Sequence, residues 1–122
     1  RFHGGLTDED LISKIANECA VFVYPGSVGL SLIHAMAYGL PAIVHSNELH
    51  HMPEIAAFEN NITGLNFIEN SARDLSNVLV KLMDSGKHRE RMSINSISKL
   101  KENFNTESMS KRFQEFLQKN KY

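Results

Sequence analysis

The sequence predicts an α/β fold in which a parallel β-sheet is flanked by helices. Over residues 1–85, short apolar runs alternate with segments of helical periodicity, the order expected when each helix crosses over between parallel strands. The runs are apolar throughout, which is typical of strands buried on both faces. Hydrophobic residues make up 42% and charged residues 22% of the 122 residues, as in an average globular domain. This composition excludes a disordered or low-complexity chain, and we expect no membrane-spanning helix.

The first helix is expected over residues 7–18. Thr7 can cap it, acidic residues fill its first turn, and apolar residues then recur at helical spacing. The apolar run 20–24 follows as a buried strand that ends at a Pro-Gly pair. A second helix is predicted over 29–38, with Gly39 as its C-terminal cap.

Two further strands complete the predicted sheet. The apolar run 41–45 predicts one of them, and the short run 65–68, which follows a polar turn, predicts the other. Between them, 46–61 is polar and irregular. A short helix is expected to begin there at Pro53, because proline suits the first helical position.

The C-terminal part of the chain is predicted to be helical. Ser71 and an acidic residue three positions later form a capping pair for an amphipathic helix over 72–84. Further helices are expected over about 87–104 and about 107–119, the last one capped by Thr106.

The length fits one domain, residues 1–122, in which 1–85 form the sheet with its crossover helices and 86–122 the C-terminal helices. The chain does not begin with methionine and residues 1–5 resemble the end of a strand, so we expect a piece of a longer protein. The single cysteine, Cys19, allows no internal disulfide and no cysteine-based zinc cluster, and its apolar neighbours predict a buried side chain. The chain is interpreted as intracellular.

Charge is unevenly distributed along the sequence. Residues 1–80 carry 3 basic and 9 acidic residues, whereas residues 81–122 carry 10 basic and 5 acidic residues. A basic C-terminal third can face an anionic membrane or an acidic partner. The alternative is that these cations solvate the outer faces of helices. Because aromatic residues are not interleaved with the basic ones and the pI is about 6.6, we expect no nucleic-acid partner.

The most informative segment is the strand, loop and helix from 24 to 41. In open α/β sheets, ligands bind at the carboxyl ends of the strands. The free N–H groups at the start of a helix, together with the helix dipole, favour an anion such as a diphosphate. Gly26 and Gly29 allow the backbone to approach such a ligand closely.

The helix over 29–38 carries a polar stripe. Ser31, His34 and Tyr38 share one of its faces, while most other positions are apolar. A polar stripe on an otherwise buried helix indicates that the helix lines a cleft. The alternative interpretation is that His34 is a core histidine bonded to a backbone carbonyl.

Several ordered motifs carry a family resemblance. The run 22–41, the Pro53-Glu54 pair and the turn and strand over 61–67 together resemble the C-terminal nucleotide-binding domain of a GT-B glycosyltransferase. The similar group is the retaining group 1, or family 4, transferases. The resemblance covers roughly residues 1–85 and implies a Rossmann-like parallel sheet with flanking helices. It also implies a nucleotide-sugar donor in a crevice between two such domains.

The family's two glutamates are replaced in this chain. Alignment on Gly29-Leu30 places the first glutamate at Gly26 and the second at His34. In the family, the second glutamate bonds the ribose hydroxyls, and a ring nitrogen of His34 can do the same. The first touches the transferred sugar, and we leave the catalytic residues unassigned. The resemblance implies a donor-binding set that consists of Gly26, Ser27, Val28, Gly29, Leu30, Ser31 and His34.

The loop after the strand 41–45 also departs from the family, which often has a Gly-Gly pair before the Pro-Glu. Here it contains His50 and His51 instead. A metal site with His45 is conceivable, but neighbouring histidines point their side chains apart and carboxylates are scarce, so no metal is expected. Glu54 is interpreted as the first-turn acid of its short helix rather than as a catalytic base.

The resemblance implies a retaining glycosyltransferase that needs no cofactor beyond its donor, most simply a UDP-sugar. The acceptor would be a glycan or a lipid-linked sugar in surface polysaccharide synthesis. The enzyme would be cytoplasmic, with peripheral contact at the inner membrane face, and this piece alone would be inactive. One alternative is a catalytically degenerate GT-B domain that acts as a nucleotide-binding or protein-interaction module. Another is a GT-B epimerase or phosphorylase.

Overall fold

The structure is a computed structural model and describes residues 9–103 of the chain. The helix expected over 107–119 and the caps Thr7 and Thr106 lie outside the described residues. The α-helices are α1 (Glu9–Asn17), α2 (Leu30–Ala37), α3 (Ala72–Met83) and α4 (Gly86–Asn103). The strands are β1 (Phe22–Tyr24), β2 (Ala42–His45) and β3 (Gly64–Phe67). Two short 3₁₀ helices, η1 (Glu48–His50) and η2 (Pro53–Ala57), lie between β2 and β3.

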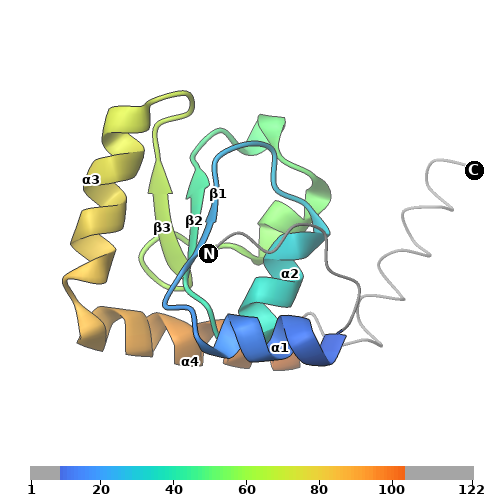
Figure 1. Ribbon diagram of the computed structural model, residues 1–122. Coiled ribbons are helices and arrows are strands. Elements are labelled where there is room, and N and C mark those ends of the chain that lie inside the picture. The colour runs from blue at the N-terminus through green and yellow to red at the C-terminus, as the bar shows by residue number, and fades with distance from the viewer. Residues whose placement is uncertain (1–8, 104–122) are drawn as a thin grey trace, which may run out of the picture.

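The three strands form a parallel sheet in the order β1-β2-β3 (Figure 1). Val23 pairs with Ile43, which in turn pairs with Leu65. The middle strand is buried along its whole length, as its uninterrupted apolar run predicts. The predicted α/β class and the parallel sheet with crossover helices are therefore confirmed.

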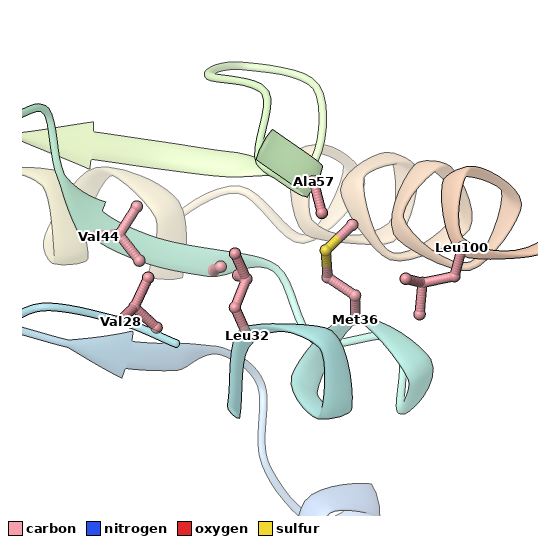
Figure 2. Packing of buried hydrophobic residues seen from close by; sticks show 7 residues of the cluster. Val28, Leu32, Met36, Val44, Ala57 and Leu100 are labelled. Atoms are coloured by element: carbon pink, nitrogen blue, oxygen red, sulfur yellow. The ribbon is translucent and has the colours of Figure 1, made fainter. Parts of the chain in front are cut away.

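Two apolar clusters cover the two faces of the sheet. On one face, residues of α2 and η2 pack against β2, and Leu100 of α4 closes the far end (Figure 2). On the other face, α3 and Met92 of α4 pack against β2 and β3. Neighbouring residues of β2 point to opposite faces, so Val44 belongs to the first cluster and Ile43 to the second. These clusters fix the strand ends and the start of α2 relative to one another.

The two ends of the sheet are covered differently. α4 runs past the amino ends of the strands and packs against both α2 and α3 (Figure 1). Gly39, with φ of +74°, turns the chain at the C-terminus of α2, and a Cβ added to it would lie 2.7 Å from Ser93 Oγ of α4. Only glycine fits this contact, which confirms Gly39 as the predicted cap. The carboxyl ends of the strands are left to the connecting loops.

Cys19 is exposed, so the prediction of a buried side chain was wrong. The apolar neighbours on which that prediction depended belong to α1 and β1, whereas Cys19 lies two residues beyond the end of α1 at Asn17, in the irregular segment before β1. Beyond the end of a helix, the helical period no longer fixes where a side chain points. The thiol donates instead to the Ile15 carbonyl, at 3.3 Å.

Candidate functional site

The loop that connects β1 to α2 reaches the carboxyl edge of the sheet, where the sequence predicts an anion site. Gly26 and Ser27 are exposed in this loop, and the side chain of Val28 is fully buried beneath it. A Cβ added to Gly26 would come no closer than 3.9 Å to another group, the ring of Tyr24. A side chain at position 26 therefore has room to extend into solvent.

The start of α2 carries no cap of its own. Gly29 is the N-cap residue, offers no side-chain hydrogen bond, and is followed by no acidic residue in the first turn. Within the described part of the chain, no hydrogen bond is found for the N–H groups of Gly29, Leu30 and Ser31. These three donors lie at the positive end of the helix dipole. They therefore suit the binding of an anion that comes from outside the helix.

The amide of Val28 is already bonded. It donates to Nδ1 of His51 at 2.9 Å, and the Val28 carbonyl accepts from the Met52 amide at 3.0 Å. The resemblance places Val28 in the donor-binding set, whereas in the structure its amide is bonded to a side chain of the segment between β2 and η2. This contact leaves the amides of Gly29, Leu30 and Ser31 open within the described part of the chain.

His34 lies on the wall of a surface hollow of about 250 Å³ between α1 and α2. Its side chain is exposed, which rules out the alternative of a core histidine. Ser31 and Tyr38 line the same hollow, so the three residues of the predicted stripe lie at a cleft, although the surface that lines it is almost wholly apolar. The remaining wall is largely apolar and includes Ile15 of α1 and Phe22 of β1.

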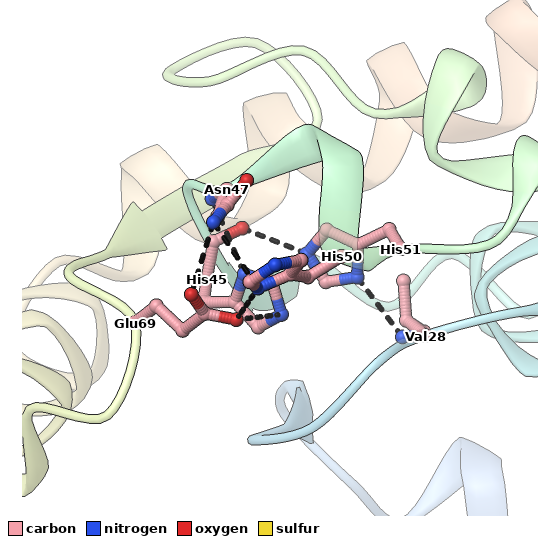
Figure 3. Close-up of polar contacts among 6 residues, drawn as sticks. All are labelled: Val28, His45, Asn47, His50, His51 and Glu69. Carbon is pink, nitrogen blue, oxygen red and sulfur yellow. Dashed lines mark hydrogen bonds and ion pairs between the residues drawn. The ribbon is translucent and has the colours of Figure 1, made fainter.

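Three histidines and Glu69 gather beside the loop, at the ends of β2 and β3 (Figure 3). The rings of His45 and His51 stack with their centroids 3.7 Å apart. His50 Nδ1 lies 2.6 Å from a carboxylate oxygen of Glu69, and His45 Nε2 lies 3.6 Å from the same oxygen. Asn47 donates to the other carboxylate oxygen at 3.0 Å. The carboxylate thus joins the ends of two strands.

Hydrogen bonds define the protonation of the two stacked rings. His45 Nδ1 accepts from the Asn47 amide, and His51 Nδ1 accepts from the Val28 amide. Each Nδ1 is therefore unprotonated, and the remaining proton sits on Nε2. In His51 this proton is donated to the His45 carbonyl at 2.8 Å.

Burial and neighbouring charge shift two pKa values in this cluster. Burial, and next the nearby ring of His51, hold the pKa of His45 below its usual range, while Glu69 opposes the shift. The hydrogen bond from His50 is the main cause that lowers the pKa of Glu69, helped by the bond from Asn47. At neutral pH, His45 is therefore neutral and Glu69 is charged.

No group of three histidine, cysteine, aspartate or glutamate side chains is placed to hold a metal ion within the described residues. Both ring nitrogens of His51 are engaged by the protein, while His50 turns to Glu69 (Figure 3). The neighbouring histidines thus have different partners. In the same part of the chain, no helix has the length and apolarity needed to cross a membrane.

Comparison with known proteins identifies the family. The sequence profile described as "Glycosyl transferases group 1" matches residues 1–99. The chain belongs to the group 1 glycosyltransferases. No curated protein matches the sequence.

Solved structures agree with a group 1 fold. Sucrose-phosphate synthase (tll1590) from Thermosynechococcus elongatus superposes with a TM-score of 0.77 at 20% identity, over 94% of this chain and 29% of that one. The C-terminal domain of a glycosyl transferase group 1 family protein (LpcC) from Francisella tularensis gives 0.71 at 18% identity, over 86% and 53%. The chain thus has the Rossmann-like fold of a GT-B C-terminal domain. It spans less than two thirds of either structure.

Sequence reasoning located the loop and α2 of this group 1 domain but missed two of the residues that support them. Glu69 follows directly after β3, and its position at the carboxyl end of a strand was a usable signal. His51 stands where the resemblance places a glycine pair, which was a second signal. Glu54 is the first-turn acid of η2, as predicted, and its Oε2 is buried without a hydrogen-bond partner.

Proposed function

We propose that this chain is the donor-binding part of a retaining, family 4-like glycosyltransferase that moves a sugar from a nucleoside diphosphate to an acceptor hydroxyl. A UDP-sugar is the proposed donor. The observation that carries the proposal is the open start of α2, where the amides of Gly29, Leu30 and Ser31 lack partners beside the exposed His34. Family membership gives this anion site its chemical context.

The reaction breaks the bond between the anomeric carbon and the diphosphate, and negative charge builds up on the departing phosphate oxygen. Preorganised N–H donors aimed at such an oxygen stabilise the transition state more than the ground state. The three amides supply this stabilisation without a metal ion. His34 is proposed to hold the ribose hydroxyls through a ring nitrogen, since its side chain is exposed and lies at the hollow next to Ser31.

The test is an NMR titration of the full-length protein with UDP, GDP and ADP, repeated on the His34→Ala variant. Shifts centred on residues 26–34 with one nucleotide, weakened in the variant, would support the donor site and identify the base. The absence of shifts with all three nucleotides would contradict the proposal.

A second candidate function is a degenerate domain that binds a nucleotide or a partner protein without catalysis. Gly26 and His34, in place of the two family glutamates, favour it. The structure leaves room for a glutamate at position 26. A Gly26→Glu/His34→Glu double variant that transfers sugar while the natural protein only binds the nucleotide would establish degeneracy. Transfer by the natural protein would exclude it.

We also propose a cytoplasmic enzyme that acts on a glycan or lipid-linked acceptor in surface polysaccharide synthesis, at the inner membrane face. The basic C-terminal third of the chain supports this placement, because anionic headgroups attract such segments. Cosedimentation with phosphatidylglycerol vesicles, but not with neutral phosphatidylcholine vesicles, would support it. Equal behaviour with both would contradict it.

A further inference from the structure

The segment that includes His51 and Met52 holds the loop before α2 through two hydrogen bonds to Val28. The Val28 amide donates to His51 Nδ1 (Figure 3). The Val28 carbonyl accepts from the Met52 amide. The neighbouring Gly29 also lies close, since an added Cβ would come within 3.3 Å of Met52 Cγ. The loop itself has exposed glycine and serine positions and no side-chain cap. The conformation of the loop therefore depends on these contacts with a segment 23 residues further along the chain.

His51 is itself held from two further sides. Nε2 donates to the His45 carbonyl at 2.8 Å, and the ring stacks on that of His45. The His45 side chain is only 2% exposed and lies between the Asn47 amide and Glu69. Rotation of the His51 ring would break both of its hydrogen bonds and the stacking. A hydrogen-bond acceptor is thus presented to Val28 at a fixed position.

We propose that His51 is a positioning residue for the phosphate-binding loop, a role that rests on the proposed donor site. By fixing the Val28 amide, it holds the next three amides in place for the donor diphosphate. His51 does not touch the ligand. Its effect falls on the diphosphate and not on the nucleoside, because the ribose contact is assigned to the side chain of His34, one turn further along α2.

Substitutions can separate the two hydrogen bonds of His51. Asparagine places an amide oxygen near the position of Nδ1, so His51→Asn keeps an acceptor for Val28. Glutamine reaches to the position of Nε2, so His51→Gln keeps a donor for the His45 carbonyl and loses the acceptor for Val28. His51→Ala removes both bonds. His50→Ala is the matched control, since His50 is the neighbouring histidine and its ring bonds Glu69 and Asn47.

The experiment measures the affinity of the full-length protein for UDP, UMP and uridine, or for the corresponding set of the base that binds. Loss of one hydrogen bond that organises the loop is expected to weaken diphosphate binding about tenfold. We expect this loss in His51→Ala and His51→Gln, and affinity near that of the natural protein in His51→Asn and His50→Ala. Nucleoside affinity is expected to stay constant in all four variants, which also reports that each is folded.

A second readout follows the contact itself. In ¹⁵N spectra, Nδ1 of His51 should have the shift of an unprotonated acceptor, and the Val28 amide signal should move in His51→Gln but return toward its natural position in His51→Asn. A merely structural role of His51 would lower nucleoside and diphosphate affinity together and would overturn the proposal. Unchanged diphosphate affinity in His51→Ala would overturn it as well. If the natural protein binds none of the nucleotides, the proposed donor site itself fails.

Discussion

The starts of α2 and α3 are the same kind of junction, a helix that follows a parallel strand, but only one of them has a side-chain cap and an acidic residue in its first turn. At α3, the Ser71 side chain accepts the Asp74 amide at 3.1 Å, and the Asp74 carboxylate accepts the Ile68 amide at 2.7 Å. At α2, the cap is Gly29, and no acid lies in the first turn. The start of α3 caps the Asp74 amide with its own side chain, although the amides of Ala72 and Arg73 have no partner among the described residues. The start of α2 has no side-chain cap, and the amide of its cap residue, Gly29, is open as well.

On the proposed function, this difference separates a structural junction from a binding one in a single fold. A helix that carries its own cap gains about 1 kcal/mol of stability. A helix without one exposes donors that any anion can use. The missing side-chain cap at α2 is thus informative because the same chain builds one at α3. Three predictions test the difference by changing the start of α2, the start of α3 and a histidine beside the loop before α2.

The largest effect is expected when α2 receives an acid of its own. Ser31 is exposed in the first turn, so Ser31→Asp should leave the fold intact and place a carboxylate beside the open amides. Repulsion of a diphosphate by this charge should weaken nucleotide binding roughly a hundredfold. The same carboxylate should raise the free energy of unfolding by about 0.5 kcal/mol, because it complements the helix dipole.

Isothermal titration with the nucleotide that binds, together with urea denaturation, measures both effects of Ser31→Asp. Ser31→Asn, which adds similar volume without charge, is the control. Equal nucleotide affinity in the Asp and Asn variants would show that the start of α2 is not the phosphate site.

The reverse exchange at α3 should change stability and leave binding alone. Ser71→Ala removes the acceptor for the Asp74 amide and should lower the free energy of unfolding by about 1 kcal/mol. Nucleotide affinity should stay unchanged, because α3 covers the other face of the sheet. Ser76→Ala, at an exposed position later in the same helix, provides the control. A loss of nucleotide affinity in Ser71→Ala would show that the start of α3 also affects binding, and it would contradict the distinction between the two helix starts.

The smallest expected effect is a loss of folding stability at acidic pH, because histidines support the loop before α2. The pKa of His45 lies below its usual 6.5, so the unfolded chain binds more protons than the folded one as pH falls below 6.5. Its contribution to stability is therefore complete above that value and is lost as pH falls toward the lowered pKa. Glu69, whose pKa is lowered from 4.5, keeps its contribution until pH falls below 4.5.

Urea denaturation at several pH values between 7.5 and 5 measures this loss. His45→Asn retains an acceptor for the Asn47 amide but cannot titrate. Its stability should therefore fall less over that range than the stability of the natural protein. The other two histidines of the cluster, His50 and His51, are still present in the variant. Parallel pH profiles would show that His45 does not carry the acid sensitivity.

The sequence predicted most of the fold because its signals are local. The capping pair at Ser71, Gly39 at the end of α2 and the apolar run of β2 each act within a few residues of the structure they determine. Pro53 likewise marks the start of η2, although the helix formed there is 3₁₀ in type. Capping, turn geometry and burial of a whole strand are short-range effects, and periodicity reveals them.

The support of the candidate site could not be predicted in the same way. The bond from Val28 to His51 joins residues 23 positions apart, and the pair His50–Glu69 joins residues 19 apart. No period in the sequence encodes such contacts, since they exist only after the strands pair. The exposure of Cys19 could not be predicted either, because the direction of its side chain depends on where α1 ends.

Cys19 also gives the protein a practical property. It is the single cysteine in the sequence, it is exposed, and its thiol sits on the carbonyl of Ile15, which lines the hollow beside His34. Within these 122 residues, a maleimide fluorophore would therefore attach at one defined place, next to the wall that the nucleoside of the proposed donor would touch. Occupancy of the hollow could then be followed by fluorescence of this chain, with no engineered labelling position.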